Sequence, residues 1–112
     1  MSFEYGDIVK VNLNPTRGHE QANYRPVLVM NSVPMPGNLS VICPITSSSI
    51  DYPLKVLLDS RTVTQGTIMC FQIQTLDLNA REAKFIEKAP EDITDHCAEY
   101  IHRLTSPIDE AI

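Results

Sequence analysis

The spacing of hydrophobic residues changes once along this chain, near residue 90, and this change restricts the fold more than any other feature. Before it, apolar residues form short runs separated by proline, glycine and polar turns, a pattern typical of β-strands. After it, they repeat with the spacing of one helical face, at Ile93, Cys97, Tyr100, Ile101 and Leu104. Pro90 suits the first turn of this helix and Pro107 ends it. The sequence therefore predicts a mainly β (α+β) fold that ends in one packed α-helix.

Six stretches of the chain are predicted to be strands: residues 7–13, 27–30, 39–45, 54–58, 67–73 and 84–88. In the first stretch, Val9, Val11 and Leu13 alternate with polar residues, so we expect one buried face. The second stretch is apolar on both faces, which indicates an interior strand, with Pro26 tolerated at its first residue. Together the stretches predict a small, mostly antiparallel barrel or a strongly bent sheet.

The chain has 112 residues and a net charge of −5, which seems to argue against a nucleic-acid partner. Its length predicts a single domain, 1–112. Residues 1–88 hold eight basic and eight acidic residues, whereas residues 89–112 hold six acidic residues and only Arg103. The acidity therefore belongs to the C-terminal segment, and the first 88 residues remain able to form a locally positive cleft.

The cysteines and the hydropathy of the chain indicate in which cellular compartment the protein works. Cys43, Cys70 and Cys97 are far apart, odd in number and match no zinc spacing, so we expect buried thiols, a reducing compartment and no structural metal. No apolar run reaches 18 residues, so no membrane helix is expected, and the N-terminal segment does not resemble a signal peptide. These features predict a cytoplasmic protein.

The densest set of chemically active side chains lies between the first two predicted strands: Arg17, His19, Glu20, Gln21 and Arg25. Histidine and glutamate can move protons near neutral pH, and arginine binds anionic oxygens in a fork. From the residues alone, Arg25 is equally consistent with a phosphate ligand and with a surface arginine paired with Glu20 or Asp77. If the protein has chemistry, we expect it in this loop.

This loop and its flanks resemble the MazF/PemK family of toxins from bacterial toxin–antitoxin pairs. The similar segments occur in the family's order: GDIV at 6–9, NPTRGHEQ at 14–21, RPVLV at 25–29, VICPITS at 41–47, QIQTLD at 72–77 and the helix from Pro90. The resemblance covers nearly the whole chain, and His19 is closer to the PemK side of the family. It implies an SH3-like barrel, a homodimer, and a sequence-selective endoribonuclease that needs no metal or other cofactor. It also implies single-stranded RNA, chiefly messenger RNA, as substrate and a cognate antitoxin as partner.

Cleavage of RNA without a metal needs a base for the 2′-OH, an acid for the leaving 5′-oxygen, and groups that stabilise the phosphate. The expected products are a 2′,3′-cyclic phosphate and a 5′-OH. By resemblance, Arg25 is the catalytic arginine and Thr46 a catalytic or phosphate-binding hydroxyl, although a strand threonine more often makes a local backbone bond. His19 and Glu20 compete for the proton transfers, and the sequence leaves their roles open.

Further residues are expected to contact RNA: Arg17, Gln21, Asn23, Tyr24, Ser47, Phe71 and Gln72. Met69 and Phe71 stand where some PemK-type relatives carry an arginine and an aspartate. Phe71 can stack on a base or belong to the core. Because of this departure, one alternative is a catalytically decayed homologue that binds RNA or antitoxin without cutting. A gyrase poison of the CcdB type is a second alternative, weakened because such proteins act through a tryptophan-containing end and this chain has no tryptophan.

Overall fold

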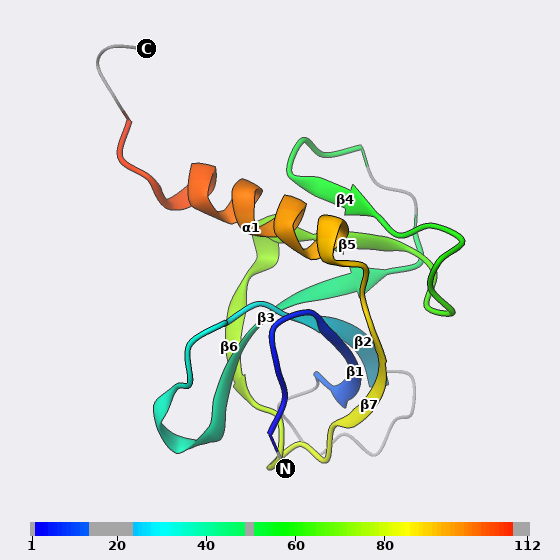
Figure 1. Cartoon of the computed structure of the whole chain (residues 1–112), viewed down its shortest axis with the longest axis vertical. Helices are drawn as coiled ribbons and strands as arrows, with labels where there is room; N and C mark the ends of the chain where they lie inside the picture. The colour runs from blue at the N-terminus through cyan, green and yellow to red at the C-terminus, as the bar shows by residue number, and fades with distance from the viewer. Residues whose placement is uncertain (1, 14–23, 49–50, 109–112) are drawn as a thin grey trace.

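The computed structural model describes residues 2–13, 24–48 and 51–108 (Figure 1). These residues form seven strands, two 3₁₀ helices and one α-helix. The strands are β1 (Asp7–Asn12), β2 (Tyr24–Val29), β3 (Leu39–Thr46), β4 (Lys55–Leu57), β5 (Thr67–Met69), β6 (Gln74–Asp77) and β7 (Lys84–Lys88). The 3₁₀ helices are η2 (Pro36–Asn38) and η3 (Cys70–Gln72), and the α-helix is α1 (Glu91–Thr105).

All strand pairs are antiparallel, in the order β4-β5-β3-β2-β1-β7, with β6 also paired to β3. Strand β3 organises the sheet because one edge pairs with β2 while the other pairs with β6 and then β5. Figure 1 shows the result: β1, β2, β3, β6 and β7 curl into a barrel, and β4, β5 and α1 lie together at one end of it. The predicted bent antiparallel barrel with a C-terminal helix is confirmed.

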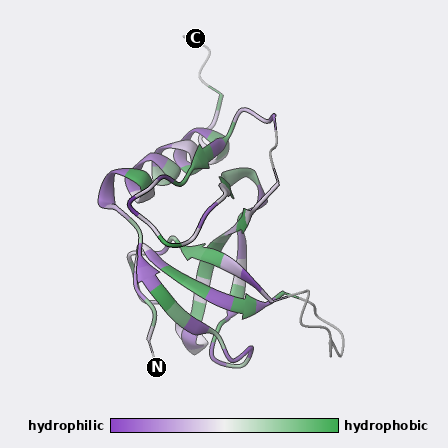
Figure 2. Cartoon of the chain, turned by 90° about the vertical axis from the view of Figure 1, so that its right-hand side faces the viewer, coloured by the Kyte–Doolittle hydropathy of each residue, from purple (hydrophilic) through white to green (hydrophobic). Residues whose placement is uncertain are grey.

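Side-chain alternation divides the core between the two faces of this bent sheet. One cluster includes Val9, Val27 and Ile42, all fully buried inside the barrel. The other includes Leu28 and Cys43, and α1 packs against it. Figure 2 shows hydrophobic residues concentrated along the strands, with purple residues between them. Strand β2 contributes to both clusters, so it is the interior strand that its sequence predicts.

Three strand predictions need correction. The strand predicted over 67–73 is wrong beyond Met69, because Cys70–Gln72 form η3 and turn the chain from β5 into β6. Strand β6 itself was not predicted, since its sequence QTLD has a single buried apolar residue. Strand β2 begins at Tyr24, so Pro26 lies inside it opposite Lys10 rather than at its start.

Helix α1 follows Pro90 and has acidic residues in its first turn and basic residues in its last, as helix-dipole considerations favour. Ile93 and Cys97 are buried in the core, and Tyr100 and Ile101 pack at its margin. Leu104 is 44% exposed, so the predicted apolar stripe is buried only along its first three turns. No helix among the described residues is long and apolar enough to cross a membrane.

The three cysteines are free and buried, as predicted, and they meet in one core cluster from β3, η3 and α1. Hydrogen bonding to the Cys70 thiol, together with burial, raises the pKa of both Cys43 and Cys97. These two thiols therefore stay protonated and act as small apolar side chains.

Candidate functional site

Arg25 is an exposed residue of β2 that lies opposite Val11 of β1. Among the described residues it makes no hydrogen bond or ion pair. Asp77, one of the two partners considered from the sequence, instead accepts a hydrogen bond from the backbone N–H of Ala80 at 3.0 Å. A guanidinium in water without an internal acid partner is free to bind an anionic ligand with two parallel hydrogen bonds.

Thr46 is the last residue of β3, and Thr67 of β5 lies opposite it. Its hydroxyl oxygen accepts a hydrogen bond of 3.1 Å from the backbone N–H of Ser48. This is the local bond expected of a strand threonine, yet it uses only a lone pair of the oxygen. The hydroxyl hydrogen is therefore available to donate to a ligand, and the Ser48 bond fixes where the oxygen lies.

The β2–β3 ladder places Arg25 and Thr46 at the same end of the sheet. Its last pair is Val27 opposite Pro44, and each candidate residue lies two positions beyond this pair on its own strand. Because side chains alternate with a period of two, Arg25 lies on the side of Val27, and Thr46 on the side of Pro44. The structure thus brings a guanidinium, unpaired within the described residues, and an oriented hydroxyl to one rim of the barrel.

Gly66 packs directly against the backbone carbonyl of Thr46. Its φ of +133° is a conformation that favours glycine, and a Cβ there would collide with the Thr46 carbonyl oxygen and lie 3.0 Å from its carbon. Its own carbonyl accepts a hydrogen bond of 2.9 Å from the Leu58 N–H. Hydrophobic spacing does not predict this role, because it depends on a contact with a residue twenty positions away.

Tyr24 and Arg81 tie the turn before β7 to the ends of β1 and β2. The Tyr24 hydroxyl donates to the Glu82 carbonyl at 2.8 Å, and Arg81 Nη1 donates to the Asn12 carbonyl at 3.0 Å. The hydrogen of the Tyr24 hydroxyl is therefore already used, while its oxygen can still accept a hydrogen bond and its ring can still contact RNA. Arg81 is not among the residues predicted from the sequence, and the fold brings it to this end of the barrel.

Phe71 lies in η3 and is half-buried. Its ring stacks on that of Tyr52, with the centroids 4.2 Å apart and the planes 19° from parallel. It is therefore neither a residue of a fifth strand nor a free ring. Ser47 and Gln72, also predicted to contact RNA, are both exposed.

Five predicted site residues lie outside the described part of the chain: Arg17, His19, Glu20, Gln21 and Asn23. Their roles, including the choice of acid and base between His19 and Glu20, stay predictions. In the sequence these residues connect the end of β1 to the start of β2, next to Arg25.

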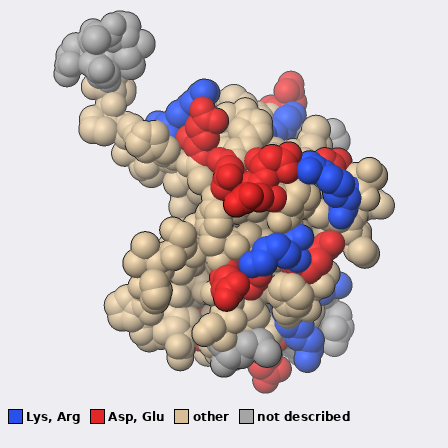
Figure 3. Space-filling model, viewed as in Figure 1, with Lys and Arg blue, Asp and Glu red and all other residues tan. Residues whose placement is uncertain are grey.

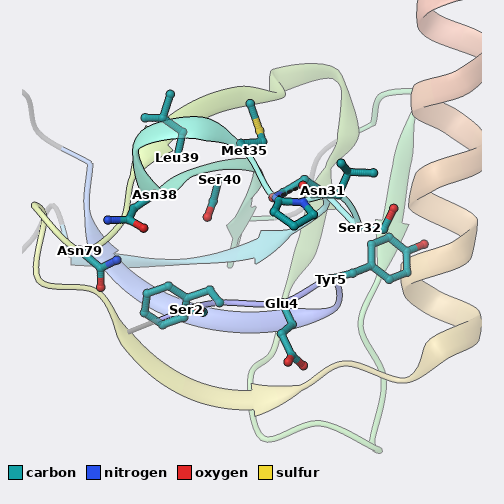
Figure 4. A pocket seen from close by; sticks show the side chains of 13 residues that line it. Ser2, Glu4, Tyr5, Asn31, Ser32, Met35, Asn38, Leu39, Ser40 and Asn79 are labelled. Atoms are coloured by element: carbon teal, nitrogen blue, oxygen red, sulfur yellow. Dashed lines mark hydrogen bonds between the residues drawn. The ribbon is translucent and has the colours of Figure 1, made fainter.

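A cavity of about 500 Å³ lies elsewhere, between the N-terminal segment and the connection from β2 to β3. Figure 4 shows Tyr5, Asn31, Met35 and Leu39 around it. None of the described site residues lines it. The cavity is therefore separate from the rim that carries Arg25 and Thr46.

Several acids are neutralised by neighbouring groups (Figure 3). Lys88 Nζ lies 2.7 Å from the buried Asp7 carboxylate and 3.5 Å from Glu4, and its hydrogen bond to Asp7 raises the pKa of Lys88. Arg61 bridges Asp59 and Asp92 at 2.8 and 2.9 Å. These pairs limit how far the net charge of −5 acts against an anionic ligand at the rim.

Comparison with known proteins identifies the family. The family model "PemK-like, MazF-like toxin of type II toxin-antitoxin system" matches residues 4–105. The chain belongs to the PemK/MazF toxin family. It is 36% identical over 110 residues to Endoribonuclease PemK of Escherichia coli, covering 93% of this chain and 80% of that protein. It is 33% identical over 94 residues to Endoribonuclease toxin MazF of Escherichia coli K12, covering 80% and 83%.

Solved structures agree with the PemK/MazF assignment. MazF from Deinococcus radiodurans superposes with a TM-score of 0.80 at 29% identity, covering 93% of this chain and 96% of that one. A MazE–MazF structure from the same organism has a TM-score of 0.78 at 24% identity and supports the fold alone. The family resemblance stated from the sequence is thus confirmed, and so is the fold that it implied.

Proposed function

We propose that this PemK/MazF-family protein is a sequence-selective endoribonuclease toxin that cleaves single-stranded RNA without a metal. The observation that carries the proposal is the placement of Arg25, which is exposed and has no partner among the described residues, at the end of the β2–β3 ladder that also carries Thr46. The curated relatives named as endoribonucleases, each matched over most of its length, support the same activity.

In the proposed reaction, the 2′-oxygen of one nucleotide attacks its own 3′-phosphorus and the bond to the 5′-oxygen of the next nucleotide breaks. The Arg25 guanidinium binds two non-bridging oxygens, and the Thr46 hydroxyl donates to the phosphate while accepting from Ser48. His19 and Glu20 take the proton of the 2′-OH and return one to the 5′-oxygen. The products are a 2′,3′-cyclic phosphate and a 5′-OH.

The proposal includes the biological setting of the family. A cognate antitoxin neutralises the protein, two copies form a homodimer, and the protein works in the cytoplasm on messenger RNA. The description of the matching family model, a toxin of a type II toxin–antitoxin system, supports an antitoxin partner.

Cleavage of a long RNA in the presence of EDTA tests the activity. We expect Arg25→Ala to lower the cleavage rate by about 10²- to 10³-fold, because a preorganised charge on the developing phosphorane is lost. Arg103→Ala is the matched control, since Arg103 is an exposed arginine on α1 whose guanidinium pairs with Glu99 and lies 5.8 Å from the centroid of the Tyr100 ring. It should cut at the wild-type rate and melt at a temperature close to that of Arg25→Ala.

Intact RNA after incubation with micromolar wild-type protein would refute the ribonuclease proposal. If the protein then still bound RNA, the decayed-homologue alternative would replace it. Equal loss of cleavage in both arginine variants would instead show that Arg25 has no special role in the reaction.

A further inference from the structure

Tyr52 and Phe71 form a parallel aromatic stack on the surface of the protein. Tyr52 precedes β4, whereas Phe71 lies in η3 after β5, so the stack joins two segments that flank the β4–β5 pair. Phe71 is half-buried and supports the ring above it, while Tyr52 is 49% exposed. The stack covers one face of the Tyr52 ring, and the ring's exposed area therefore includes much of the other.

Tyr52 differs from two other tyrosines in how its hydroxyl is used. The Tyr5 hydroxyl donates to Asp95 at 2.8 Å, and the Tyr24 hydroxyl donates to the Glu82 carbonyl. Within the described residues the Tyr52 hydroxyl has no hydrogen-bond partner. The ring of Tyr52 is therefore stacked on Phe71 and about half exposed, and its hydroxyl, unbonded within the described residues, can bond to a ligand.

The stack lies within reach of the candidate catalytic rim. Thr67 is opposite Thr46, and the chain then runs two residues along β5 and two along η3 to Phe71. At about 3.3 Å per strand residue and about 2 Å per 3₁₀ residue, this path is roughly 11 Å long, and the step from Thr46 to Thr67 adds about 5 Å. The sum is an upper limit on the separation, and at about 3.4 Å per nucleotide of a stacked strand it corresponds to at most about five nucleotides.

We infer that the Tyr52–Phe71 stack is a binding subsite for an unpaired base of the RNA substrate, a few nucleotides from the scissile phosphate. Unpaired bases are commonly recognised by stacking on exposed tyrosine and phenylalanine rings, and such stacking tolerates any base. The inference rests on the proposed ribonuclease function. It assigns Tyr52, which is not among the residues predicted from the sequence, to substrate binding and Phe71 to supporting it.

Binding measurements with an uncleavable probe test the subsite. Single-stranded oligonucleotides with 2′-deoxy sugars lack the attacking 2′-OH and keep every base. We expect Tyr52→Ala and Tyr52→Leu to weaken their binding by roughly 5- to 140-fold, as stacking energies imply. Tyr52→Phe should bind like the wild type because it keeps the ring. The slope of log affinity against log salt should be the same in all four proteins, because no phosphate contact is lost.

A fluorescent variant reports on stacking directly. The chain has no tryptophan, so Tyr52→Trp introduces a single indole at the subsite. Its emission should be quenched by single-stranded oligonucleotides, but not by an abasic strand with the same number of phosphates. This readout does not depend on cleavage, so it separates failure of the subsite from failure of the ribonuclease proposal.

Three results would overturn the inference. Wild-type affinity in Tyr52→Leu would show that the ring is not needed, and a shallower salt slope in Tyr52→Ala would show a phosphate contact rather than a stacked base. Equal quenching of Tyr52→Trp by the abasic strand would show that no base lies on the ring.

Discussion

Replacing Gly66 with alanine tests whether the close approach of Gly66, just before β5, to Thr46 maintains the candidate site. The φ of +133° is strained for alanine, at a cost of about 1–3 kcal/mol. The new Cβ would also collide with the Thr46 carbonyl oxygen and touch Ile45 Cγ2 at 3.3 Å. Forcing packed backbone apart costs about 1–3 kcal/mol more. The sum, about 2–6 kcal/mol, is a large part of the 5–15 kcal/mol that stabilises a typical domain.

The matched control is Gly37→Ala. Gly37 also has a positive φ, +69°, but no atom lies within 4 Å of where its Cβ would be. Gly37→Ala should therefore lose only the stability that a left-handed φ costs an alanine, about 1–2 kcal/mol. At about 4 °C per kcal/mol for a chain of this size, Gly66→Ala should melt roughly 8–24 °C below the wild type and Gly37→Ala roughly 4–8 °C below it.

Calorimetry gives the two melting temperatures, and an RNA-cleavage assay at a temperature where both variants are folded gives their activities. Displacing Thr46 by a fraction of an ångström should lower cleavage by at least about tenfold in Gly66→Ala, while Gly37→Ala stays near the wild type. Equal melting temperatures in the two variants would refute the argument that the contact with Thr46 matters to stability. Wild-type cleavage by Gly66→Ala would refute the positioning of Thr46.

Three further changes test other parts of the structure. Burial and the hydrogen bond to Asp95 raise the pKa of Tyr5 to about 12. The contribution of Tyr5 to stability is therefore present below pH 10 and is lost between pH 10 and about 12. Tyr5→Phe should remove this loss, and denaturant titrations across that pH range measure it. Burial raises the pKa of Glu87, but hydrogen bonds from the backbone of 63–64 outweigh it, so the pKa is lowered. Glu87→Gln should cost about 1–2 kcal/mol at neutral pH by chemical denaturation, and a difference that persisted well below pH 4 would contradict this origin. Thiol reagents should modify the native protein no faster than it unfolds, and one rapid equivalent would disprove the burial of Cys43, Cys70 and Cys97.

The sequence predicted the fold well where hydrophobic spacing alone decides the structure. Alternation at Val9 and Val11 marked β1, and the uninterrupted apolar run after Pro26 marked β2 as interior. It failed between β5 and β6, because Cys70 is buried and Ile73 half-buried, so the apolar pattern continues through the η3 turn. A 3₁₀ turn of three residues has no period long enough to interrupt such a pattern.

The site was predictable in its residue types but not in its supports. Arg25 and Thr46 could be proposed from the sequence because both belong to recognisable segments. Gly66 and Tyr52 could not, since their importance depends on contacts with residues about twenty positions away along the chain. Such contacts follow from which strands pair, and hydrophobic spacing does not determine pairing.

The distribution of charge gives the proposed stacking subsite a physical reason. Arg61, Lys88 and Arg103 are each held by carboxylates, and an RNA phosphate would have to displace these acids to bind there. Arg25 faces no such competition among the described residues. A protein with net charge −5 gains less from counterion release than a basic nuclease does. Its affinity for RNA must then depend more heavily on contacts to bases. An exposed aromatic stack near the rim supplies such a contact, and stacking on it does not depend on the charge of the protein.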